Sequence, residues 1–80
     1  MTKRRVMLTF SQEIVSEPVI YNLGQQFNLV TNILRADVTD DRGWVVLELD
    51  GKEHDIEAGT TWAISRGVRV EPISNEQGEI

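Results

Sequence analysis

Histidine occurs once in the sequence, at His54. It lies among Lys52, Glu53 and Asp55, at the start of a predicted helix, where we expect a solvated surface position. A metal site needs about three or four converging ligands, and these neighbours do not supply them. Cysteine is absent, which excludes disulfides, thiolate metal sites, iron–sulfur ligation and a cysteine nucleophile. The sequence therefore indicates no metal and no cofactor.

The acidic residues Asp37, Asp40 and Asp41 form a second candidate site. Neighbouring carboxylates can bind Ca²⁺, but the ligand spacing and the closing glutamate of an EF-hand loop are missing. We interpret these acids as solvated residues of a turn. None of the serines has a base near it in the sequence, and Ser16 is placed to cap a helix. Since no nucleophile elbow or phosphate-binding loop is present, we expect a protein that is not an enzyme.

Length and charge exclude several classes of partner. The 80 residues suffice for one domain, and 13 acidic residues against 8 basic ones give a formal net charge of −5. Nucleic-acid binding requires clustered Lys and Arg, so we expect no nucleic-acid partner. No apolar run approaches the ~20 residues of a membrane span, and residues 6–10 are too short for a signal peptide. We expect no membrane insertion and a cytoplasmic location.

The hydrophobic pattern predicts four strands and two helices. Residues 4–10 alternate, as a half-buried strand does, and a strand over 44–49 places Val45, Leu47 and Leu49 on one face. Asn28 is expected to end the first helix, and Gly43 to adopt positive φ in a hairpin turn. The predicted elements are a strand over 4–10, a helix from Ser16–Pro18 to 27, strands over 29–39 and 44–49, a helix over 53–66 and a strand over 68–73.

This βαββαβ order predicts a ferredoxin-like sandwich of the α+β class, with a four-stranded antiparallel sheet and two helices on one face. The domain is expected to cover residues 1–73, followed by a polar C-terminal tail over 74–80. In the second helix, the apolar face is expected to consist of Ile56, Thr60, Ala63 and Ile64.

The sheet face without helices carries apolar side chains. If Val45 and its neighbours meet the helices, the opposite face includes Met7, Trp44, Val46 and Ile73. An exposed apolar face with an aromatic residue is typical of a partner surface. The alternative is that so small a domain cannot bury all its apolar side chains.

Asn32 lies within the apolar strand over 29–39, where asparagine is disfavoured. Counting by two places it with Val30, Leu34, Ala36 and Val38. Its amide needs hydrogen-bond partners, which an amino-acid ligand could supply. Local bonding to the backbone at a bulge or strand end is the alternative. This strand is also expected at the sheet edge, where its backbone can pair with a partner chain.

Three segments together resemble the NIL domain family: Ser16-Glu17-Pro18-Val19-Ile20, the triplet Asn32-Ile33-Leu34, and Gly67-Val68-Arg69-Val70-Glu71. The resemblance covers about residues 4–73. It implies a regulatory domain like those on the ATPase subunits of methionine-uptake ABC transporters, which bind the amino acid and pair as dimers. NIL domains also accompany iron–sulfur ferredoxin modules.

By this resemblance the chain is expected to be a homodimer that binds an amino acid such as methionine through Asn32. The alternative function is a ligand-free protein–protein interaction module that accompanies a transporter or an iron–sulfur redox partner.

Overall fold

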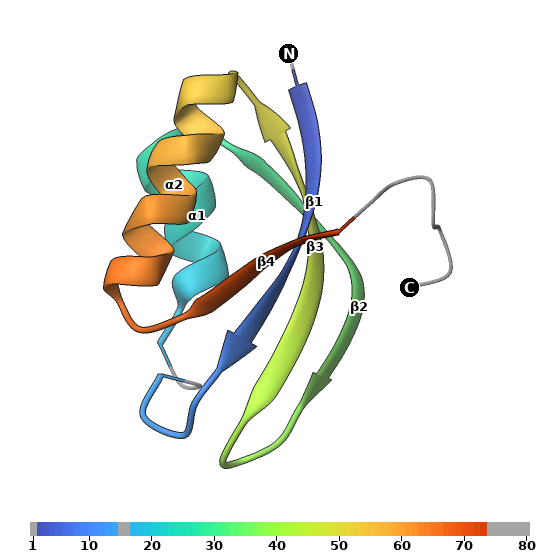
Figure 1. The fold of residues 1–80 in the computed structure, drawn as a ribbon, viewed down its shortest axis with the longest axis vertical. Helices are drawn as coiled ribbons and strands as arrows, with labels where there is room; N and C mark the ends of the chain where they lie inside the picture. The colour runs from blue at the N-terminus through green and yellow to red at the C-terminus, as the bar shows by residue number, and fades with distance from the viewer. Residues whose placement is uncertain (1, 15–16, 74–80) are drawn as a thin grey trace.

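The computed structural model of the chain describes residues 2–14 and 17–73. Its four strands form one antiparallel sheet in the order β2-β3-β1-β4, and both helices lie on one side of this sheet (Figure 1). The predicted ferredoxin-like fold is therefore confirmed. The predicted cap Ser16 and the predicted tail 74–80 lie outside the described residues. In chain order the elements are β1 (Thr2–Phe10), α1 (Val19–Phe27), β2 (Val30–Val38), β3 (Gly43–Gly51), α2 (Glu53–Ser65) and β4 (Arg69–Ile73).

The core lies between the sheet and the two helices. Alternate residues of β1 and β3 face it, as the alternation predicts, because successive side chains of a strand point to opposite faces. Leu47, at the centre of the sheet, is fully buried. The buried cluster consists of Val6, Leu8, Phe10, Val19, Leu23, Leu29, Val45, Leu47, Leu49, Ile56, Ala63 and Val68.

Helix α1 begins directly after Pro18 and ends at Asn28. Asn28 has φ 57° and ψ 43°, the left-handed conformation. Asparagine adopts it more readily than most residues, and a residue in this conformation is a common helix terminator. The predicted end of this helix is confirmed. Pro18 occupies the capping position rather than the first turn where it was expected.

Helix α2 buries a narrow face made of Ile56, Gly59 and Ala63. A β-carbon at Gly59 would be 3.1 Å from Leu23 Cδ2 and 3.2 Å from Leu29 Cδ1, so glycine lets α2 pack closely against its neighbours. The expectation that Ile64 belongs to this face is wrong, since Ile64 is 55% exposed. Each residue advances about 100° around a helix, which carries Ile64 away from the face of Ala63.

A paired hydrogen-bond motif ends α2. Val68 N–H donates to the carbonyl of Ala63 at 3.1 Å, and Gly67 N–H donates to that of Ile64 at 3.0 Å. Gly67 has φ 95°, which a residue without a β-carbon adopts at little cost. These bonds satisfy two carbonyls at the helix end, as in the Schellman motif, and confirm Gly67 as the predicted stop.

The hairpin between β2 and β3 is confirmed, but its conformation differs from the prediction. The Thr39 N–H donates to the Arg42 carbonyl at 2.7 Å. Gly43 lies within β3, opposite Phe10 and Val38, and among the glycines of residues 2–14 and 17–73 only Gly67 has positive φ. The expected positive φ at Gly43 is wrong. Instead, its missing side chain makes room for Val38, whose Cγ2 would lie 3.0 Å from a β-carbon there.

Candidate functional site

A β-bulge in β2 determines which residues of the strand share a face with Asn32. Asn32 lies opposite Glu48 and Ile33 opposite Leu47, but Val46 lies opposite Arg35, so one residue of β2 is inserted between them. A bulge of this kind reverses the alternation that follows it. Asn32 therefore shares the open face of the sheet, the face without helices, with Val30. The expectation that it also shares a face with Ala36 and Val38 is wrong.

Beyond the bulge, Arg35 and Asp37 lie on the open face, opposite Val46 and Trp44. Ala36 and Val38 lie on the helix side, opposite Val45 and Gly43. The asparagine side chain is exposed, so water can satisfy its amide and no internal partner is needed. Asn32, Glu48 and Arg5 lie opposite one another across β2, β3 and β1. The Glu48 carboxylate is 3.7 Å from Arg5 Nε.

Three of the four apolar residues predicted for an interaction surface are accessible on the open face. The register places Met7 opposite Val46, Trp44 opposite Thr9, and Ile73 opposite Arg5, which puts all four side chains on this face. Met7, Trp44 and Ile73 are half-buried. Val46 is only 1% exposed, so it supports this surface from below and offers a partner almost no contact area.

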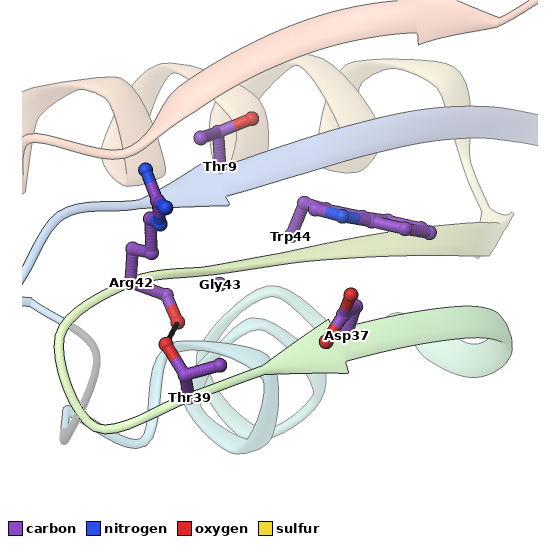
Figure 2. A pocket seen from close by; sticks show the side chains of 6 residues that line it. All are labelled: Thr9, Asp37, Thr39, Arg42, Gly43 and Trp44. Atoms are coloured by element: carbon purple, nitrogen blue, oxygen red, sulfur yellow. Dashed lines mark hydrogen bonds between the residues drawn. The ribbon is translucent and has the colours of Figure 1, made fainter.

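A hollow of about 410 Å³ lies on the open face beside the hairpin. In Figure 2 the Trp44 indole lies between Thr9 on β1 and Asp37 on β2, and Arg42 extends from the hairpin end. The Thr39 hydroxyl donates to the Arg42 carbonyl at 3.0 Å, which fixes the hairpin near this hollow. The lining residues are Thr9, Asp37, Thr39, Arg42, Gly43 and Trp44.

The hollow combines a cation, an anion and an aromatic surface. Such a set can hold a small molecule that carries both charges and an apolar group, because charged hydrogen bonds fix orientation while the indole contributes apolar contact. Neither Arg42 nor Asp37 was predicted as a site residue, and Asp37 was interpreted as a solvated acid of a turn. The sequence pattern gave little indication of this site, because Asp37 lies on the same face as Trp44 only as a result of the bulge.

A second unusual surface lies along β2. The large apolar side chains that are exposed in the described residues are concentrated on this strand. Four of them belong to β2, and Tyr21 of α1 is 66% exposed. Tyr21 and Val38 line one groove of about 190 Å³ on the helix side of the sheet. The exposed residues are Tyr21, Val30, Ile33, Leu34, Val38 and Ile64.

His54 lies at the start of α2, with its Nε2 3.1 Å from an Asp55 carboxylate oxygen. Its side chain is 78% exposed, the surface position that the sequence predicted. Within residues 2–14 and 17–73, no three His, Cys, Asp or Glu side chains are grouped as a metal site would require. In the same part of the chain, neither helix is long and apolar enough to cross a membrane.

The fold is shared with solved structures, two of which are described here. One is the C-terminal domain of an ABC transporter ATP-binding protein from Enterococcus faecalis, with a TM-score of 0.78 and 24% identity over 90% of this chain and 84% of that one. The other is the de novo designed protein Ferredog-Diesel, with a TM-score of 0.50 and 16% identity over 91% of this chain and 85% of that one. No curated protein sequence matches the chain.

The sequence also matches a family model over nearly its whole length. The matched residues are 4–72, and the model is that of the NIL domain. The match includes the Asn32-Ile33-Leu34 triplet, all of α1, β2, β3 and α2, and most of β1 and β4. The chain belongs to the NIL domain family.

Proposed function

We propose that this chain is a regulatory domain that binds a small amino acid such as methionine and acts as a homodimer in the cytoplasm, in association with an ABC transporter. It carries out no catalysis of its own. The observation that carries the proposal is the exposed Asn32 of the family triplet, which lies on the open face of an edge strand. The similarity to the C-terminal domain of an ABC transporter ATP-binding protein supports the transporter association.

The amide of Asn32 suits this role. Its carbonyl accepts hydrogen bonds from an ammonium group, and its N–H₂ donates to a carboxylate. A ligand regulates a partner only if it binds one state more tightly than another. A homodimer meets that requirement when the ligand stabilises one arrangement of its two copies over another.

Isothermal titration calorimetry of the chain with L-methionine tests the binding. We expect saturable heat for the unaltered chain and at least about tenfold weaker binding for Asn32→Ala, since the loss of hydrogen bonds to charged groups costs about 1.5–3 kcal/mol. Gln25→Ala, on the exposed surface of α1, is the matched control and should bind as the unaltered chain does. The absence of heat and of any thermal shift at millimolar methionine would exclude this function.

A second candidate function is protein–protein interaction over the open face, without a ligand. It is favoured by Met7, Trp44 and Ile73, which are half-buried on a face that no helix covers, with Val46 beneath them. The partner would be a transporter or an iron–sulfur redox protein. Trp44→Glu should weaken co-purification with such a partner. Methionine binding should be undetectable in the unaltered chain and in the variant alike. Measurable methionine binding would count against this candidate.

A further inference from the structure

A groove of about 230 Å³ lies between α2 and the edge strand β4, on the helix side of the sheet and at the edge opposite β2. Figure 1 shows β4 starting beside the C-terminal end of α2 and then diverging from the helix. The strand ends at Ile73, opposite Arg5, so in the described part of the chain residues 2–4 of β1 have no strand neighbour on this side. Because β4 leaves the helix and stops early, the space between them stays open. We call it the α2–β4 groove.

The α2–β4 groove is apolar at its floor and along one wall. Val6 of β1 and Ile56 of α2 form the floor, and only 7% and 3% of these residues are exposed. Val70 and Pro72 line the groove from β4, and Thr60 lines it from α2. Val70 and Thr60 are half-buried, and Pro72 is exposed. An apolar side chain that enters the groove therefore contacts apolar groups on three elements.

The charges around the groove leave one carboxylate without a counter-ion. Arg4 Nη2 lies 2.9 Å from Glu53 Oε2. Arg5 Nε lies 3.7 Å from Glu48 Oε2, so both arginines that line the groove already have acidic partners. Glu57 also lines the groove and is exposed, and among the described residues it belongs to no salt bridge. The groove is thus complementary to an apolar group that is accompanied by a cation.

We infer that the α2–β4 groove binds a short helical segment of a protein partner, which inserts one large apolar side chain and places a lysine or arginine against Glu57. The groove is smaller than the pockets of about 300–1,000 Å³ that hold small molecules, so one anchoring side chain suits it better than a whole ligand. On a helix, side chains three or four residues apart lie about 5–6 Å from each other, which lets one segment supply both contacts. This surface shares no residue with the proposed amino-acid site, and the inference does not rest on that site.

Pro72 decides between a helix and an added strand as the occupant. A strand that pairs with β4 needs the backbone N–H groups of its outer edge, and proline has none. Proline in an edge strand therefore discourages strand addition. A helix makes its backbone hydrogen bonds internally, so it can dock beside β4 through side chains alone, as amphipathic helices do in apolar grooves.

Selection from a displayed peptide library tests the inference on the unaltered full chain. The probe is a library of helix-forming peptides of about 16 residues, a length that supports a helix, with the residues of one face randomised. We expect the selected peptides to share a large apolar residue that is followed three or four positions later by lysine or arginine. Selected peptides without this pair, or no enrichment over a support without the protein, would overturn the inference.

Filling the groove should abolish the binding of the selected peptides. Thr60→Phe places a ring over Val6 and Ile56, and it should weaken binding by about tenfold or more, as the loss of a buried anchor does. Thr61→Phe is the matched control, because Thr61 is exposed on α2 but does not line the groove. Circular dichroism melting shows that both variants fold. If the two variants bind the peptides equally well, the peptides dock elsewhere and the inference is wrong.

Charge reversal tests the second contact at an exposed position, where folding is not at risk. Glu57→Lys should weaken binding of the selected peptides by about fivefold or more at low salt, because attraction becomes repulsion. A new selection on this variant should enrich aspartate or glutamate at the position of the cation. Glu13→Lys, beyond the opposite end of β1, changes the net charge equally and should leave binding intact. Unchanged selection on Glu57→Lys would contradict the contact.

The same variants reveal two other occupants. If Thr60→Phe lowers the molar mass in light scattering relative to Thr61→Phe, the groove holds a second copy of the chain and the inference is wrong. If Thr60→Phe abolishes methionine binding in calorimetry while Thr61→Phe does not, the groove is the amino-acid site, and the inference is again wrong. An unaltered chain that binds no methionine but selects the expected peptides would exclude the proposed function and support the groove.

Discussion

Gly59 of α2 lies against Leu23 of α1, and a β-carbon at position 59 would be 3.1 Å from Leu23 Cδ2. Helix α2 has weak helix propensity around Gly59-Thr60-Thr61, so its position depends on packing. The close approach of these two residues therefore explains why a glycine is present in the middle of a helix.

Gly59→Val should destabilise the domain, because the added methyl groups overlap Leu23 and Leu29. Overpacking of a core costs about 1–3 kcal/mol, measurable by urea denaturation. Ala58→Val, one residue earlier on the exposed surface, is the control and should change the free energy of unfolding by less than about 0.5 kcal/mol. Equal costs for the two substitutions would contradict the close packing of α2 on α1.

Asn28 should tolerate glycine but not a β-branched residue. Its φ of 57° costs roughly 1–2 kcal/mol for residues with an ordinary β-carbon. Asn28→Gly should leave the melting temperature unchanged or raise it, and Asn28→Val should lower it. If Asn28→Val melts at the same temperature as the unaltered chain, α1 does not end in the left-handed conformation.

Val46 should behave as a core residue although it lies on the open face. At 1% exposure, its truncation in Val46→Ala should cost about 1–3 kcal/mol in the free energy of unfolding. Val30→Ala is the control, because Val30 is 64% exposed on the same face. A cost for Val46→Ala no greater than that of the control would mean that Val46 is accessible to partners after all.

The ion pair between Arg66 and Glu17 should contribute little. The two side chains are 48% and 31% exposed, with Arg66 Nη2 2.9 Å from Glu17 Oε1. Because solvent screens such pairs, Arg66→Ala should cost no more than about 1 kcal/mol. The cost should shrink further in 1 M salt, where the screening length is about 3 Å. A larger, salt-independent cost in denaturation experiments would indicate that the aliphatic stem of Arg66 provides packing.

The fold could be predicted because its strongest signals are local. Counting by two over residues 4–10 and 44–49 assigned the faces of β1 and β3 correctly, because neither strand contains a bulge in its pairing with the other. Residues 29–38 contain a bulge. They are largely apolar or small, without glycine or proline to mark a bulge, so counting by two placed Asn32 on the wrong face relative to Ala36 and Val38.

The candidate site could not be predicted for the same reason. Asp37 and Trp44 belong to different strands, and only the register after the bulge brings them side by side. The exposure of the β2 side chains could not be predicted either, because an apolar edge strand has the same sequence pattern as a buried strand. Both features depend on which residues oppose each other across strands, a relationship that a local pattern does not contain.

If the amino acid binds at the hairpin hollow, Arg42 and Asp37 should contact its two charged groups separately. Arg42 is the cation of the hollow, so Arg42→Gln should weaken binding of L-methionine but not of L-methioninamide, which lacks the carboxylate. Asp37 is the anion, so Asp37→Asn should weaken binding of methionine but not of N-acetyl-L-methionine, which lacks the ammonium group. Each lost charged contact should cost about 1.5–3 kcal/mol, or roughly tenfold or more in the dissociation constant measured by calorimetry. Equal weakening of the amino acid and its analogue by either substitution would show that the charged groups of the ligand lie elsewhere.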